Sequence, residues 1–250
     1  MSLFHDNVLF GASGSGSGPL YVDDVFSTAL YTGNGSTQTI TNGIDLAGEG
    51  GLLWTKIRGS SGSHALFDSE RGTGYSIYTD SSSTQDSRSD ISSFNSDGFT
   101  LGIAGVTNTS NDDFCSWTFR KAPGFFDVVT YTGNSTSGRT ISHNLGSVPG
   151  FIVIKALNDS RHFSCFHRSI GNTKAIFLSS NTTPTNAAAY WNNTDPTDTV
   201  FTLGNDLDVN ATGTNYVAYL FAHDDQSFGT DEDEAIIKCG QYTGNGTTDG

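Results

Sequence analysis

Short apolar runs separated by clusters of turn-forming residues recur along the whole chain. Residues 51–57 are almost continuously apolar, which predicts a central strand, whereas residues 64–70 and 75–78 alternate as half-buried strands do. Gly, Ser, Thr and Asn interrupt these runs at short intervals, and these residues favour turns over helices. The pattern predicts an all-β fold with almost no helix, a β-sandwich of jelly-roll type.

The same pattern occurs twice in full and begins a third time. The signature Tyr31-Thr-Gly-Asn34 returns 100 residues later at Tyr131, and a further 111 residues later at Tyr242. Longer matches support the repeat: residues 98–102 match residues 200–204, and Lys56 of one apolar run matches Lys155 of the next. Such spacings are those of tandem modules of about 100 residues.

The repeat divides the chain into four segments. Residues 21–122 form the first predicted module and residues 123–229 the second, while residues 230–250 hold an acidic linker and the start of a third copy. Residues 1–20 match no copy. A lone terminal strand cannot bury its apolar face, so we expect the natural protein to continue beyond Gly250.

The first twenty residues combine an apolar tip with a flexible tether. Residues 11–18 are Gly and Ser-rich, a composition typical of mobile linkers. The apolar residues before them predict a docking peptide, although packing against the first module is the alternative. The candidate docking residues are Leu3, Phe4, Val8, Leu9 and Phe10.

Composition excludes several classes of protein. Twelve Lys and Arg oppose 26 Asp and Glu, giving a formal charge of −14, and no basic cluster is dense enough to follow a phosphate backbone. Nucleic acid is therefore not an expected partner. No apolar run approaches 18 residues and no secretory leader is evident, so we expect neither membrane insertion nor conventional secretion.

The cysteines and histidines do not suggest a metal site. Cys115, Cys165 and Cys239 are widely spaced without a Cys-x-x-Cys motif, and the first two lie in aromatic-rich runs typical of small buried hydrophobic residues. His64 aligns with His162, while His167 is expected on the opposite strand face. Oxygen-rich residues 205–210 and 231–234 could bind calcium, but they lack EF-hand spacing, and a solvated acidic surface is favoured.

Two pairs of carboxylates are the best catalytic candidates, Asp45 with Glu49 and Asp68 with Glu70. Asp68 and Glu70 would share one strand face, which suits a glycosidase only if a groove surrounds them. The second copy has no matching pair, so an ordinary solvated strand face is the favoured interpretation. We predict no catalytic residue and no cofactor.

The three tryptophans are the candidates for stacking on a sugar. Trp54 and Trp117 lie within strong strand patterns, which favour core packing. Trp191 lies in a polar segment, which predicts a loop. It is therefore the one residue retained as a candidate ligand contact.

Several segments closely resemble the tandem-repeat structural proteins of marine tailed bacteriophages. The clearest are residues 121–134, 141–150 and 216–222, and residues 167–174, residues 191–196 and the leader at 1–14 fit as well. The resemblance implies a virion component built from lectin-like sandwich modules, in a tail fibre, a tail-associated appendage or a head fibre. It supplies no catalytic residue.

These observations together predict a non-enzymatic virion structural protein, synthesised in the host cytoplasm. We expect the N-terminal part of a tail fibre or tail-associated appendage, docked on other virion proteins of the tail or capsid through residues 1–20. We also expect a homo-oligomer, with a trimer as one form. The alternatives are a carbohydrate-binding adhesin that contacts a host-surface glycan, a capsid or head fibre, and a glycan-degrading enzyme.

Overall fold

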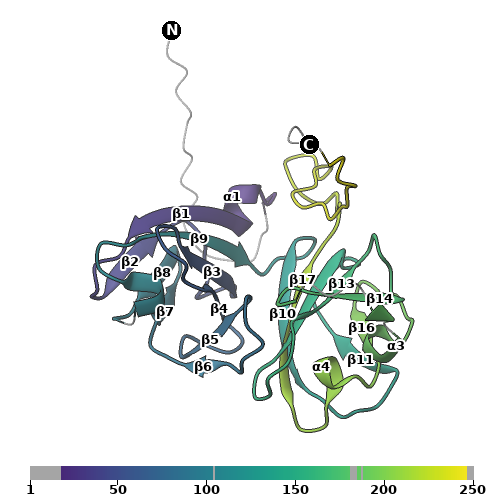
Figure 1. Ribbon diagram of the computed structural model, residues 1–250. Coiled ribbons are helices and arrows are strands. Elements are labelled where there is room, and N and C mark those ends of the chain that lie inside the picture. Colours follow the sequence, from purple (N-terminus) through teal and green to yellow (C-terminus); the bar gives the residue numbers. More distant parts are fainter. Residues whose placement is uncertain (1–17, 104, 181–184, 187, 247–250) are drawn as a thin grey trace.

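The computed structural model describes residues 18–103, 105–180, 185–186 and 188–246. Antiparallel sheets dominate this part of the chain, and its four helices are only four residues long each (Figure 1). The all-β prediction is confirmed. Runs rich in Ser, Thr, Gly and Asn carry no extended helical face, so burial of alternate side chains in strands is the stable solution.

The first module is a sandwich of two antiparallel sheets. Its larger sheet has the order β1 (Phe26–Thr32), β9 (Asp113–Arg120), β3 (Gly51–Ile57), β4 (His64–Asp68), β5 (Tyr75–Tyr78) and β6 (Asp86–Ser87). Its smaller sheet has the order β2 (Gln38–Thr41), β8 (Gly98–Leu101) and β7 (Ile91–Asn95). The helices are α1 (Val22–Val25), before β1, and α2 (Gly105–Asn108), before β9. Buried side chains from the facing sheets, such as Leu53, Phe67 and Phe99, fill the space between them.

The second module repeats this arrangement, except that its smaller sheet has two strands among the described residues and no counterpart of β7. Its larger sheet has the order β10 (Phe126–Thr132), β17 (Asn215–Phe221), β12 (Phe151–Ala156), β13 (Ser164–His167), β14 (Lys174–Phe177) and β15 (Thr185–Asn186). Opposite it lie β11 (Arg139–Ser142) and β16 (Val200–Leu203), with α3 (Ala188–Trp191) and α4 (Leu207–Asn210) in the connections. In both modules the first strand pairs with the last strand of the same module, so each sandwich is closed by its own ends.

A further apolar core joins the two modules, which lie side by side in Figure 1. Each larger sheet turns one face towards its own small sheet, and we call the opposite face the outer face. The outer faces of the two modules pack against each other through buried side chains: Leu52, Leu66 and Ile77 from the first module, and Val128, Val153, Cys165 and Tyr219 from the second. The modules therefore form one continuous packed body.

Candidate interaction surface

In each complete module the repeated signature packs in the core against the last strand of that module. The ring of Tyr31 stacks on Phe114 of the last strand, with 5.3 Å between ring centroids, and meets Phe99 edge-on. Its hydroxyl donates a hydrogen bond to the backbone oxygen of Thr107 at 2.9 Å. Burial raises the pKa of Tyr31 well above its ordinary value, so the hydroxyl stays a donor at neutral pH.

A fully buried asparagine holds the remainder of the signature. Asn108 accepts a hydrogen bond from the backbone N–H of Asn34 at 3.0 Å, and its amide group donates to the backbone oxygens of Ser36 and Gly102. Gly33 must be glycine, because a Cβ there would collide with the chain that follows Asn108. One side chain thus ties residues 34–36, near the start of the module, to residues 102–108 near its end.

The second module contains the same network at equivalent positions. Tyr131 stacks on Tyr216 at 5.1 Å and donates to the backbone oxygen of Val209, and Asn210 takes the place of Asn108. The sequence pattern alone did not reveal the role of Asn108 and Asn210, although their separation of 102 residues equals that of the matched strands. The signature therefore has the same structural contacts in both modules.

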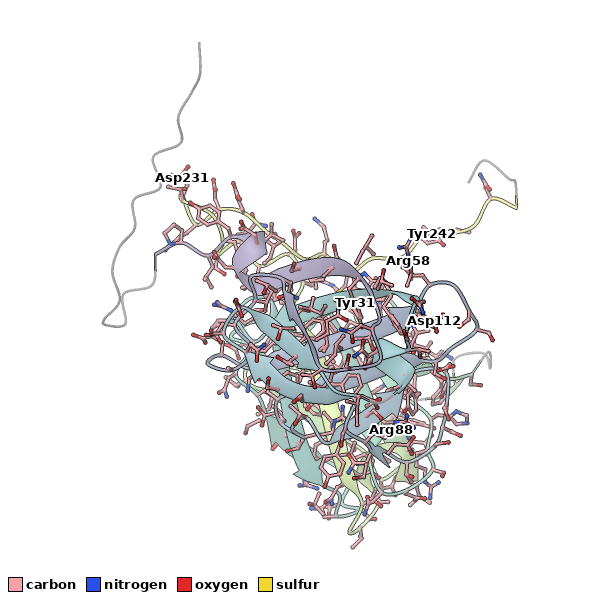
Figure 2. The ribbon with its side chains drawn as sticks, turned by 90° about the vertical axis from the view of Figure 1, so that its left-hand side faces the viewer. Tyr31, Arg58, Arg88, Asp112, Asp231 and Tyr242 are labelled. Carbon is pink, nitrogen blue, oxygen red and sulfur yellow. The ribbon has the colours of Figure 1, made fainter. Side chains whose placement is uncertain are left out.

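The third copy of the signature is exposed. Tyr242 is 94% exposed, whereas Tyr31 is 8% exposed, and residues 235–242 form no strand. Figure 2 shows Tyr31 within the body of the molecule and Tyr242 on the C-terminal segment outside it. The first strand of each complete module pairs with the last strand of that module, and residues 235–242 have no such partner within the described residues.

The end of the second module, just before the acidic linker, folds back onto the start of the first module. Phe228 is buried in the core between the modules, and the backbone N–H of Gly229 donates to the oxygen of Leu20. Asp224 precedes this turn and Ile237 follows it, and the N–H of Asp224 donates to the backbone oxygen of Ile237. At the first junction the N–H of Ala122 donates to the backbone oxygen of Phe126 in the same way. The extra residues of the second junction are therefore looped out, and the contact on either side of them is kept.

A buried ion pair of the first module contacts a tyrosine of the second module. The Nε of Arg71 lies 2.6 Å from Oδ2 of Asp68, and both side chains are almost completely buried. Tyr219 of the second module donates its hydroxyl hydrogen to the same carboxylate oxygen at 2.7 Å. The interpretation of Asp68 as part of a solvated strand face is wrong, because the second module covers that face.

The other carboxylates of the candidate catalytic pairs have separate structural contacts. Glu70 lies on the surface, where it forms an ion pair with Lys121 at 2.9 Å. Asp45 accepts a hydrogen bond from the backbone N–H of Gly48 and so stabilises the turn that leads to the exposed Glu49. Asp68 and Glu70 thus lie in different environments, one buried and one exposed.

A lysine of the second module is buried under the first. The Nζ of Lys155 donates to the backbone oxygens of Ser82 and Arg161 and lies 5.5 Å from the ring centroid of Phe163. Burial lowers the pKa of Lys155 to about 8. Its counterpart Lys56 is half-exposed and bonds to backbone oxygens of its own module.

Part of the outer face of the first module remains uncovered, and we call it the open face. It consists of Leu30, Trp54, Lys56, Cys115 and Trp117, from the neighbouring strands β1, β9 and β3. Trp54 and Trp117 are directly opposite each other, with 5.9 Å between ring centroids and 67° between ring planes. With Phe119 they line a shallow apolar depression of about 180 Å³.

The open face corrects two expectations. Trp54 and Trp117 are half-buried at the surface, because the side chains of their strands that fill the sandwich core are the alternate ones. Cys115 is likewise half-buried, whereas Cys165 is buried as predicted, and all three cysteines are free thiols. Leu30 is 68% exposed, which is unusual for so large an apolar side chain.

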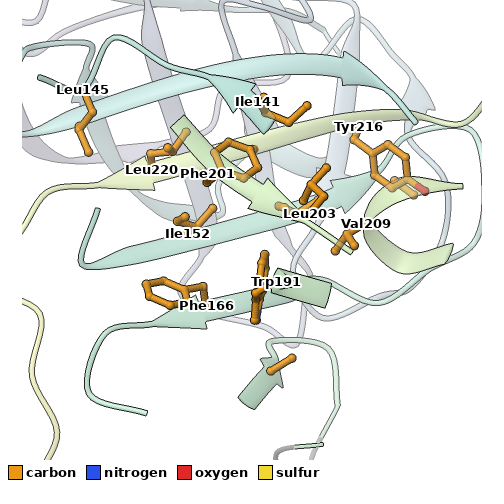
Figure 3. Close-up of a cluster of buried hydrophobic side chains, with 14 of the residues drawn as sticks. Ile141, Leu145, Ile152, Phe166, Trp191, Phe201, Leu203, Val209, Tyr216 and Leu220 are labelled. Carbon is orange, nitrogen blue, oxygen red and sulfur yellow. The ribbon is translucent and has the colours of Figure 1, made fainter. Parts of the chain in front are cut away.

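Trp191 lies in the core of the second module, which contradicts its assignment to a polar loop. Its side chain is 2% exposed, packs edge-on against Phe166, and donates its Nε1–H to the backbone oxygen of Lys174 (Figure 3). The polar residues around it in sequence concealed the helix α3, which points the ring inward. A ring buried in this way cannot stack on an external sugar.

The three histidines considered as metal ligands, His64, His162 and His167, have separate contacts. His64 accepts a hydrogen bond from Nε1 of Trp54, and burial together with Lys56 lowers its pKa. The strand register places Phe163, one residue after His162, at the position equivalent to His64. Among the described residues, no group of three or more His, Cys, Asp or Glu side chains could hold a metal ion.

Two expectations concern the ends and surroundings of the chain. The candidate docking residues Leu3, Phe4, Val8, Leu9 and Phe10 lie outside the described residues. No helix within the described ranges has the length and hydropathy needed to cross a membrane.

The fold and its junction define a tandem all-β protein in which two sandwich modules share a core. The chain belongs to the family described as Domain of unknown function (DUF7483), whose model matches residues 22–250. Searches of curated proteins and of solved structures find no match.

Proposed function

We propose that the chain is a non-enzymatic structural component of a bacteriophage virion, the N-terminal part of a tail fibre or tail-associated appendage. In this proposal its modules are lectin-like jelly rolls, and residues 1–20 dock on other virion proteins of the tail or capsid. A capsid or head fibre is the other mounting that the same architecture would serve.

The observation that carries the proposal is the shared core between the modules. Independent binding modules are ordinarily joined by linkers that let them move, and their interfaces are small and polar. Here the outer faces interlock through large apolar side chains, including Leu66, Val153 and Tyr219, around the Asp68–Arg71 ion pair. Such a junction fixes the angle between successive modules, which is what a rigid appendage requires.

The use of polar side chains supports a structural role. The groups that recur between modules, such as Asn108 and Asn210, are buried and bonded to backbone. The best catalytic candidate, Asp68, is held by Arg71 and Tyr219 and is closed off from solvent. A buried and fully paired carboxylate has no access to a substrate.

Cryo-electron microscopy of particles from the encoding phage tests the proposal. Particles carrying the complete chain would be compared with particles whose copy lacks residues 1–18. We expect the appendage to disappear while the modules remain folded in the lysate, and its former position to identify tail or capsid. A matched control replaces Leu3, Phe4, Val8, Leu9 and Phe10 with Ser at unchanged length, and it should also lose the appendage.

Two outcomes would contradict this assignment. Absence of the complete chain from purified particles would rule out a virion component. Retention of the appendage without residues 1–18 would show that the modules themselves make the attachment.

A carbohydrate-binding adhesin is the second candidate function, and a mixed surface pocket on the second module favours it. The pocket holds about 450 Å³ and combines an apolar side, including Val148 and Pro149, with the polar side chains of Arg168, Asp195 and His223. Sugar sites combine apolar and polar contacts in this way. Binding of host-surface glycan that is lost in Arg168→Ala but kept in the control Arg58→Ala would support it.

A further inference from the structure

The open face of the first module matches a face that is buried in the second. The strand registers pair Trp54 with Val153, Trp117 with Tyr219, Cys115 with Val217 and Lys56 with Lys155 as equivalent positions. All four residues of the second module are almost completely buried, whereas all four of the first are half-exposed. The two modules thus present the same kind of surface, and only one of them is covered.

The surface that covers these four residues of the second module is part of the outer face of the first module. Leu52, Leu66 and Ile77 of the first module pack on it, and the residues around Ser82 close over Lys155. These residues come from the β3–β4–β5 side of the first module. The β1–β9–β3 side of the same sheet extends beyond the second module and forms the open face.

The open face is continuous with the interface between the modules. Phe119, which lines the depression with Trp54 and Trp117, also contacts Phe126 and Phe221 of the second module. Trp54 packs against the edge of the inter-module core. The apolar surface of the interface therefore continues past the edge of the second module and becomes exposed to solvent.

The composition of the open face fits a protein surface better than a sugar. The depression is lined by three aromatic side chains, and the indole N–H of Trp54 is already bonded to His64. Beside it Leu30 projects into solvent at 68% exposure. Exposed contiguous apolar surface of this kind is typical of protein interfaces, whereas a sugar also requires polar partners.

We propose that the open face is the contact between two copies of this chain, each presenting the same surface to the other. Within the chain, this type of face is buried by the outer face of another module, and the uncovered outer surface of the first module is available on every copy. A self-complementary surface produces an isologous pair with two-fold symmetry. The inference goes beyond the virion role and does not depend on it.

Charge sets a condition on this pairing. The formal charge of −14 makes two copies repel each other over long distances, and salt screens that repulsion. Lys56 belongs to the open face and His64 lies next to it, and Asp80 is the carboxylate that acts on His64. We therefore expect pairing to strengthen as ionic strength rises.

Sedimentation analysis of the complete chain, from micromolar to near-millimolar concentration, tests the pairing. We expect the wild type to reach twice the 26.5 kDa mass of one chain at the upper end. Leu30→Arg should stay at the single-chain mass throughout, because it places a charge in the contact. The control Ile103→Arg changes a residue that is 73% exposed outside the open face, and it should behave as wild type. Thermal unfolding of the diluted variants checks that both are folded.

Fluorescence gives an independent readout, because Trp191 is buried and acrylamide quenching therefore reports Trp54 and Trp117. Quenching should fall as the wild-type concentration rises and should stay constant in Leu30→Arg. A single-chain mass of the wild type at all concentrations, or a two-chain mass of Leu30→Arg equal to that of the wild type, would overturn the proposal. A mass of three chains would overturn its two-fold symmetry.

The same measurements would reveal two other occupants of the open face, and either one would overturn the pairing. If residues 1–17 cover the face, their deletion will increase quenching in dilute solution. If a sugar is the occupant, glucose or galactose will protect the tryptophans while the chain keeps its single-chain mass.

Discussion

The two modules share one fold, but their outer faces have opposite environments. Lys155 is buried under the first module with a lowered pKa, whereas Lys56 at the same strand position is half-exposed. Tyr219 bonds to a buried carboxylate, whereas Trp117 in its place faces solvent. Repetition thus preserves the contacts within a module, while the contacts between modules are made once and use different residues on each side.

The largest expected effect comes from breaking the ion pair at the junction. Asp68→Asn keeps the shape of the side chain but leaves the buried guanidinium of Arg71 without a counter-charge. We expect the free energy of unfolding to fall by about 3–5 kcal/mol. Urea denaturation followed by circular dichroism measures this loss, and the shared core predicts that both modules unfold in one transition.

Glu70 provides the matched control for the ion pair. Glu70→Gln removes a partly exposed pair with Lys121, so its cost should stay within about 1 kcal/mol. Equal losses in Asp68→Asn and Glu70→Gln would show that the junction pair has no special role. Two separate transitions in the wild type would contradict a shared core.

The buried asparagines Asn108 and Asn210 test whether the hydrogen-bond network that both modules share contributes equally to their stability. Asn108→Ala and Asn210→Ala each leave a buried backbone oxygen, at Gly102 and Gly204, without its donor. We expect each change to cost about 1–3 kcal/mol. Because the hydrogen bonds of the two asparagines to the backbone match, the two losses should be similar when measured in urea.

A strong asymmetry between these two variants would contradict the equivalence of the modules. The exposed Asn111 supplies a control, since its side chain bonds only to the hydroxyl of Ser110. Its backbone lies in the left-handed region, so Asn111→Gly is the suitable change, and it should alter stability by less than about 0.5 kcal/mol.

The fold was predictable from sequence because it depends on pattern within a module. Alternation in the strands and the recurrence of the Tyr31 signature predicted an all-β fold, and the almost continuously apolar run at residues 51–57 is the central strand β3. The role of Asn108 was not recognised, because a polar residue in a turn-rich segment usually contacts solvent. Its offset from Asn210 was the signal that could have identified it.

The surfaces were much less predictable, because contacts between modules have no period. Asp68 and Trp54 lie on outer-face strands, and nothing local shows that the second module covers one and leaves the other open. Trp191 was misplaced for a related reason, since α3 is too short to show helical periodicity. Predicting these positions would require the relative placement of the modules.

The pH dependence of stability provides a smaller test of the covered face. The pKa of Lys155 in the folded chain is about 8, below its ordinary value of 10.5. Between these values the unfolded chain binds the proton and the folded chain does not, so this lysine makes stability rise with pH. The rise should approach about 1.4 kcal/mol per pH unit.

Other groups titrate in the opposite direction, so the lysine must be isolated by difference. Burial raises the pKa of Cys165 to about 12, and that contribution lowers stability as the pH rises above 9. We therefore compare the wild type with Lys155→Met between pH 8 and 10. The wild-type curve should gain stability relative to the variant, and the control Lys56→Met should follow the wild type. Parallel curves for all three proteins would show that Lys155 is solvated.

The smallest expected effect distinguishes the third copy of the signature from the first two. Tyr31→Phe and Tyr131→Phe each remove a hydroxyl that donates to a backbone oxygen, at Thr107 and Val209, and should cost about 0.5–1.5 kcal/mol. Tyr242 is 94% exposed, so Tyr242→Phe should leave the free energy of unfolding unchanged within error. A loss in Tyr242→Phe equal to that in Tyr31→Phe would mean that the third signature is also packed in solution. Because residues 235–242 have no pairing strand within the described part of the chain, that packing would require a strand from elsewhere. If the loss in Tyr242→Phe persists at high dilution, the partner strand belongs to the same chain. If the loss disappears on dilution, a second copy supplies the strand.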